Sequence, residues 1–186
     1  MTATIEPTII KERLPSASAR LSLAPIGSVP GLLDGAWWPR SRDLLREIPT
    51  LTGVLDACWG RITRVTVNPA HWPVIPRKVP VAGHTVHVGW FADEQDPNKM
   101  ILFSYTVGRL DLLVIPPETE PAAAARLMAA ATVPGGFGTA SGLMADEATS
   151  HDAAEARSRE EEWETDGGAA SAAGAATGTL TSAPRR

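Results

Sequence analysis

Large apolar side chains are concentrated in one block of the sequence, and this limits where a folded core can form. Residues 19–132 contain five of the six tryptophans and most of the Ile, Val and Leu residues. Residues 133–186 consist mainly of Gly, Ala, Ser, Thr and acidic residues, which bury too little surface to offset the entropy lost on ordering. We therefore predict a disordered segment over residues 1–18, one globular domain over residues 19–132, and a disordered acidic Ala/Gly-rich tail over residues 133–186.

The net charge of −4 is carried by the tail rather than by the predicted domain. Residues 19–132 contain eleven basic and ten acidic residues, whereas residues 133–186 contain four basic and nine acidic residues. A domain this close to neutral is not typical of a strongly basic nucleic-acid-binding module. Arginine outnumbers lysine fourteen to three, which is typical of a coding sequence rich in G and C, so each arginine indicates a functional site less strongly.

Cysteine content and hydropathy indicate a reducing compartment. Cys58 is the single cysteine, so the chain forms no internal disulfide. Charged residues interrupt the N-terminus where a signal peptide would need an apolar run. The longest strongly apolar run, residues 112–117, is far shorter than the ~20 residues that a membrane span needs. We predict a soluble cytoplasmic protein that has no membrane segment.

Alternating apolar residues between Gly and Pro predict a sheet of short strands. The expected strands are residues 20–24, 61–67, 84–91, 99–106 and 110–115, with residues 36–38 extended. The expected helices are residues 42–47, 50–59 and 120–131, with Ser41 and Thr119 as N-caps and Pro49 separating the first two. Because consecutive strands with short connections usually pair antiparallel, we predict an α+β fold. It is a four- to five-stranded antiparallel, curled or barrel-like meander, packed on one face or end with two to three short helices.

The stretch "AWWPRSR" is the most prominent candidate surface. Neighbouring side chains of an extended segment point to opposite faces, so we expect one of Trp37 and Trp38 in the core and the other at the surface near Arg40 or Arg42. Two interpretations stay open. The segment is either a structural corner with solvated arginines, or a binding surface, since Trp and Arg dominate binding hot spots.

A binding surface at this corner would combine desolvated aromatic area with guanidinium groups that engage an anion. The residues predicted to form it are Trp37, Trp38, Arg40, Arg42, His71 and Trp72. The partner would be a protein or an anionic ligand, with nucleic acid a less favoured choice. A broader set that suits nucleic acid adds Trp59 and the basic residues Arg46, Arg61, Arg64, Arg77 and Lys78.

Within the predicted strand at residues 61–67, Ile62, Arg64 and Thr66 are expected to share one face.

No catalytic, metal or cofactor site is indicated by the spacing of reactive residues. His84 and His87 lie three apart in a predicted strand and face opposite sides, so they do not share a metal ion. Cys58 has no neighbouring Cys or His, and neither a Gly-x-Ser-x-Gly elbow nor a phosphate-binding loop is present. We predict no catalytic residue, no metal and no cofactor.

The leading hypothesis is therefore a non-catalytic binding or accessory domain that uses a Trp/Arg surface. Two alternatives are an enzyme with an unrecognised pocket and a weak nucleic-acid-binding protein. A deep pocket holding His71, Asp34 and Arg40 together would favour the enzyme. A continuous stripe of arginines across one sheet face would favour nucleic acid.

The predicted domain also resembles a known family. The segments "LDGAWWPRSRDLLREIPTL", "RVTVNPAHWP", "VGWF", "ILFS" and "LDLLVIPP", followed by an Ala-rich helix, resemble an actinobacterial family of small proteins known only as a domain of unknown function. The resemblance covers residues 19–132. It implies the same domain limits and an actinobacterial, cytoplasmic setting, and it implies no activity and no catalytic residue.

Overall fold

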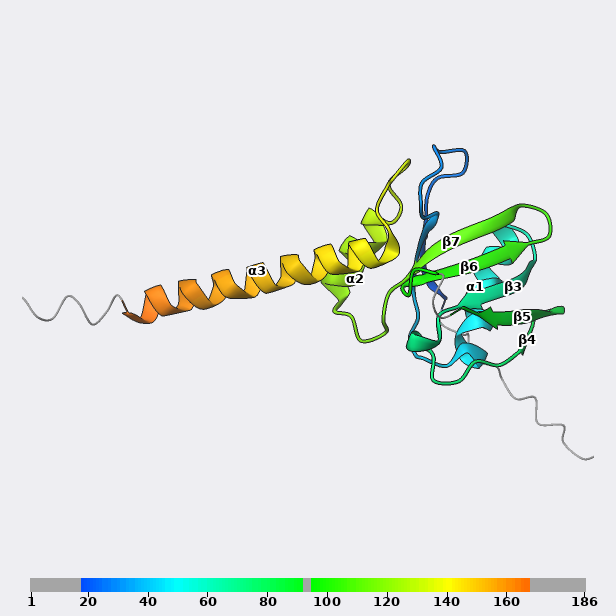
Figure 1. Cartoon of the computed structure of the whole chain (residues 1–186), viewed down its shortest axis with the longest axis horizontal. Helices are drawn as coiled ribbons and strands as arrows, with labels where there is room; N and C mark the ends of the chain where they lie inside the picture. The colour runs from blue at the N-terminus through cyan, green and yellow to red at the C-terminus, as the bar shows by residue number, and fades with distance from the viewer. Residues whose placement is uncertain (1–17, 92–94, 168–186) are drawn as a thin grey trace, which may run out of the picture. The chain divides into compact units, whose positions relative to one another are not determined.

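A computed structural model describes residues 18–91 and 95–167, so the prediction for residues 1–17 lies outside the described residues (Figure 1). The described strands are β1 (Arg20–Leu23), β2 (Gly35–Trp38), β3 (Ile62–Val67), β4 (Lys78–Val81), β5 (His84–Trp90), β6 (Lys99–Ser104) and β7 (Gly108–Val114). The helices are α1 (Leu44–Cys58), α2 (Pro121–Ala130) and α3 (Ala140–Gly167), together with the 3₁₀ helix η1 (Pro69–His71). The described residues up to Ala145 form one compact unit, and those from Asp146 form a second.

The predicted α+β class is confirmed, but the sheet is larger than predicted and is mixed. Seven strands follow the order β1-β2-β7-β6-β3-β5-β4, and the sheet does not close into a barrel. The pairs β2–β7 and β3–β5 are parallel, and the other four pairs are antiparallel. The hairpin of β4 and β5 returns the chain beside β3, so β5 runs parallel to it. Pro80 lies in the edge strand β4, where its missing N–H removes no bond from a second neighbour.

Helices cover both faces of the sheet, rather than one face or end as predicted. Consecutive residues of a strand point to opposite faces. Leu112 accordingly packs with Leu51 and Leu55 of α1, whereas Leu113 packs with Ala124 and Leu127 of α2. The α1 side carries the larger core, where α1 contacts β3 and β4 (Figure 1). The α2 helix contacts mainly β2 and β1, so it covers one end of the other face.

One helix, α1, replaces the two helices predicted on either side of Pro49. Leu44, Ile48, Leu51 and Leu55 recur every three or four positions and are fully buried, and this burial outweighs the cost of an internal proline. Pro49 lies near the helix start, and the N–H that it lacks would have faced the carbonyl of Leu45, a half-exposed residue that water can reach. Asp43, rather than the predicted Ser41, is the N-cap, and its carboxylate accepts a 3.0 Å bond from the Leu45 N–H.

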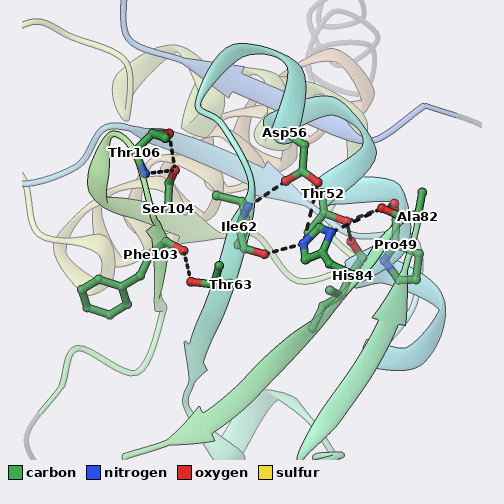
Figure 2. A network of polar contacts seen from close by, with 11 residues as sticks. Pro49, Thr52, Asp56, Ile62, Thr63, Ala82, His84, Phe103, Ser104 and Thr106 are labelled. Carbon is green, nitrogen blue, oxygen red and sulfur yellow. Dashed lines mark hydrogen bonds and ion pairs between the residues drawn. The ribbon is translucent and has the colours of Figure 1, made fainter.

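A polar network joins the end of α1 to the start of β3 (Figure 2). The carboxylate of Asp56 accepts a bond from the Ile62 N–H at 2.8 Å, and the ring Nε2 of His84 lies 2.7 Å from the Ile62 carbonyl oxygen. Gly60 turns the chain between the two elements with φ of +73°, and a Cβ there would lie 2.2 Å from Thr106 Oγ1. These contacts fix the position at which β3 enters the sheet.

Packing continues beyond Thr132, where the sequence placed the end of the domain. Ala140 is buried, and Leu143 and Met144 pack against the core on the α2 side. Ser141 donates two bonds to the carboxylate of Asp96, from its hydroxyl at 2.7 Å and from its N–H at 2.9 Å. Within the tail predicted as disordered, the structure has the helix α3 at Ala140–Gly167, and the prediction for residues 168–186 lies outside the described residues. In this described part of the chain, no helix is long and apolar enough to cross a membrane.

Candidate anion-binding face

Two of the residues predicted for binding form part of the core. Trp37 is fully buried, and its ring stacks on that of Trp72 with centroids 5.7 Å apart and planes 17° apart. Trp72 itself is only 4% exposed. Both rings belong to the cluster under α1. They stabilise this end of the sheet and offer no ring face to a partner.

Trp38 points to the opposite face, as the alternation along an extended strand requires. The guanidinium of Arg20 lies 3.4 Å from the centre of the Trp38 ring and donates to the Trp38 carbonyl oxygen at 3.0 Å. The indole N–H donates to the carbonyl oxygen of Pro116 at 3.2 Å. Sequence reasoning placed Arg40 or Arg42 over this ring, but Arg20 of the neighbouring strand takes that place.

The two arginines predicted for binding, Arg42 and Arg40, differ in the hydrogen bonds and ion pairs that their guanidinium groups form. Arg42 donates to the His71 carbonyl oxygen at 3.0 Å and forms an ion pair with Glu118. Arg40 is exposed, and within the described residues its guanidinium donates to the Ser18 carbonyl oxygen, at 3.5 Å. Burial, together with the charge of Arg42, lowers the pKa of His71, so the neutral imidazole is favoured there.

The part of the sheet face that α2 leaves uncovered carries a row of basic side chains. Strand register places one residue from each of five neighbouring strands in line across this face. In order from β4 to β7 they are Lys78, His87, Arg64, Phe103 and Arg109. Alternation puts all five opposite to α1, because the next residues along these strands, such as Val65, Val79 and Val88, lie in the α1-side core. We call these five residues the basic row.

A β-bulge in β3 gives Arg64 its place in the row. Ile62 pairs with Ser104 and Arg64 pairs with Phe103, so β3 has one extra residue, Thr63, between them. Ile62 can therefore enter the core while Arg64, two residues later, faces solvent. The prediction that Ile62 shares a face with Arg64 and Thr66 is wrong for this reason.

A hollow of about 540 Å³ lies beside the row. Its charged and titratable lining residues are Arg64, Arg77, Lys78 and His87, and no described residue of the lining carries a carboxylate. Its aromatic lining residues, Trp90 and Phe91, are about half exposed. Among the residues that the structure describes, no carboxylate pairs with Arg64, Arg77 or Lys78.

At the β7 end of the row, the positive charge is neutralised by a carboxylate. Arg109 donates two bonds to the carboxylate of Asp111, at 2.7 and 2.8 Å, and these bonds raise the pKa of Arg109. Lys99 lies 3.5 Å from the same carboxylate. Positive charge that has no counter-ion among the described residues is therefore concentrated over β3, β4 and β5, and Phe103 separates it from the neutralised end.

Sequence reasoning found part of this face. Arg64, Arg77 and Lys78 belonged to the broader basic set, but their common face depends on the pairing of strands distant in sequence. His87 was considered only as a metal ligand, and the exposed ring of Phe103 was missed. Outward positions in alternating strands were the one available signal, and the register that aligns them has no local sequence signature.

The three residues that would have favoured an enzyme do not converge. Asp34 precedes β2 and accepts a bond from the Asp111 N–H at 2.8 Å, whereas Arg40 follows β2. A second, mostly apolar pocket of about 340 Å³ includes Asp34, Cys58 and Trp59 in its lining. The carboxylate of Asp34 is already bonded, so this pocket has no converging set of reactive groups on its described lining.

Comparison with known proteins places the folded part of the chain. Residues 20–131 match DUF5994, which is described as a family of unknown function. The chain belongs to this family. The DUF5994 match contains the whole sheet, α1, α2 and every residue of the basic row, and it confirms the predicted domain of unknown function. No curated protein and no solved structure matches the chain.

Proposed function

We propose that this DUF5994 domain is a non-catalytic binding domain and that its open sheet face takes an anionic partner. The observation that carries the proposal is the basic row with its adjoining hollow, where three cations have no described counter-ion. The predicted corner at Trp37 and Trp38 is a weaker candidate, because Arg42 is paired with Glu118 and the Trp37 ring is buried.

Exposed basic side chains on three adjacent strands suit a partner that carries several negative groups. His87 is in register with both Arg64 and Lys78, so these two charged side chains lie on either side of it, two strand spacings or ~10 Å apart. Positive charges at this distance repel each other at low salt, and a bound anion relieves that repulsion. Such binding weakens as salt rises, because the groups are exposed and salt screens them.

Removing two of these charges should weaken retention on a polyanion. We expect the double variant Arg64→Gln/Lys78→Gln to elute from a heparin column at clearly lower salt than the parent protein. For two lost contacts, the slope of log K against log salt should fall by roughly 1.5. All four residues changed in this variant and its control are exposed, so thermal melting should be nearly unchanged.

The matched control is Arg40→Gln/Arg46→Gln, which removes the same charge from the predicted corner and from α1. We expect its elution to stay close to that of the parent protein. Equal shifts for the two double variants would mean that only net charge matters and would end the proposal. If the control eluted at lower salt than the Arg64→Gln/Lys78→Gln variant, the contact surface would be the corner rather than the open sheet face.

A further inference from the structure

We infer that the anionic partner is a single-stranded nucleic acid whose bases stack on Phe103. The inference rests on the proposed function, because it needs the same face to bind an anion, and it goes further by assigning the partner's chemistry. Its basis is the position of one exposed aromatic ring next to Arg64, at the end of the charged part of the row.

The basic row has the dimensions of a short nucleic-acid strand. Five strands with four spacings make it about 19 Å long, which corresponds to roughly five or six nucleotides at the ~3.4 Å spacing of a stacked strand. Phe103 lies between Arg64 and Arg109 in register and remains 37% exposed. Its ring projects from β6 away from the Asp56–His84 contacts (Figure 2), so one row presents both phosphate-binding and base-stacking groups.

The hollow provides a second place for a base. Gly89 lies in register with Thr66, and a Cβ at Gly89 would have only the Thr66 hydroxyl within reach, at 4.0 Å. The missing side chain thus leaves the hollow open next to Arg64. Trp90 and Phe91 lie at its edge, each about half exposed.

The aromatic rings favour a single strand over other polyanions. A base stacks on an aromatic side chain only when its flat face is free, and in a duplex both faces of each base are covered by neighbouring base pairs. A sulfated sugar or an acidic peptide satisfies the cations but gains little from Phe103. Stacking is tolerant of sequence because every base has such a face, so we expect weak base preference.

Fluorescence anisotropy with the full chain and a labelled oligothymidylate tests the inference. We expect the oligothymidylate to bind more tightly than a duplex of the same length. Phe103→Leu, which keeps an apolar side chain, should weaken oligothymidylate binding roughly five- to a hundred-fold and leave binding of inorganic polyphosphate unchanged. Phe137→Leu, at a 90% exposed ring outside the row, should change neither.

A second variant blocks the hollow without removing charge. Gly89→Val places a strand-favouring side chain where the neighbouring atoms leave room, so the variant should melt no lower than the parent protein. We expect it to weaken oligothymidylate binding by tenfold or more.

The results separate this inference from the proposed function. Polyphosphate, duplex and oligothymidylate bound equally well, with Phe103→Leu unchanged, would overturn the inference and leave the anion-binding face standing. No binding to any of the three polyanions would overturn both.

Discussion

Trp37→Ala should lower the free energy of unfolding by about 3–5 kcal/mol, the usual cost of truncating a buried aromatic residue. The Trp37 side chain is fully buried, and its two neighbours along β2, Ala36 and Trp38, belong to the other face, so neither of them can fill the space. The variant also leaves the ring of Trp72 without its stacking partner. Urea unfolding monitored by circular dichroism measures the loss.

Trp38→Ala is the matched comparison, because it removes the same side chain from the adjacent position. It loses one bond to the Pro116 carbonyl oxygen and the contact with Arg20, which together are worth about 1–2 kcal/mol, and the packing of a partly buried ring against the α2-side core. The loss should therefore be smaller than that of Trp37→Ala, by about 1 kcal/mol or more. Similar losses would show that the ring of Trp38 contributes as much to its core as the fully buried ring of Trp37.

Removal of residues 133–186 should lower stability by about 2–4 kcal/mol, whereas removal of residues 146–186 should have almost no effect. The first truncation takes away the buried Ala140, the packing of Leu143 and Met144, and the two bonds from Ser141 to Asp96. The second takes away only the unit that begins at Asp146. Thermal unfolding of fragments 1–132 and 1–145 beside the full chain measures both effects.

The difference in stability between the same two fragments should depend on pH. Burial alone would raise the pKa of Asp96, but bonds from Ser141 and from the Asn98 N–H outweigh it and lower the pKa. A carboxyl group whose folded pKa is depressed contributes stability above its unfolded pKa, ~3.9, and loses it as pH falls through the folded pKa. The difference in stability between fragments 1–145 and 1–132 should therefore narrow below about pH 4. If the two fragments were equally stable at neutral pH, this would support the domain end at Thr132 that the sequence predicts.

Local patterns in the sequence were enough to place most elements of the fold. The strands at residues 62–67, 84–90, 99–104 and 108–114 agree with prediction to within two residues, because alternating apolar residues between Gly and Pro are a local signal. The opposite orientation of Trp37 and Trp38 also followed from strand geometry alone. Pro49 misled the prediction, because tertiary burial of the α1 face outweighed a local helix-breaking signal.

Long-range pairing was the part that the sequence could not supply. The parallel pair β2–β7 joins segments about seventy residues apart, and no pattern in either segment specifies the other. The candidate face depends on the same missing information, since the row forms only when β3 pairs with both β5 and β6. The bulge at Thr63 was also not predicted from the sequence, and it changes which residues of β3 face solvent.

Charge counting over the whole domain also concealed the site. Eleven basic and ten acidic residues suggested a neutral surface, but the structure separates them. Asp111 neutralises Arg109, and Glu118 neutralises Arg42, whereas Arg64, Arg77 and Lys78 have no described ion-pair partner. A local excess of positive charge can thus exist on a domain whose total charge is near zero.

Backbone amide chemical shifts, followed by NMR while an oligothymidylate is added to the protein, locate the contact surface directly. If the open sheet face binds the strand, the largest changes should lie in β3, β5 and β6, around Arg64, His87 and Phe103, and the amides of α1 around Arg46 should stay still. Changes centred on Trp38 and Arg40, with the open face silent, would show that the partner binds at the other end of β2 and that the basic row is only a solvated surface.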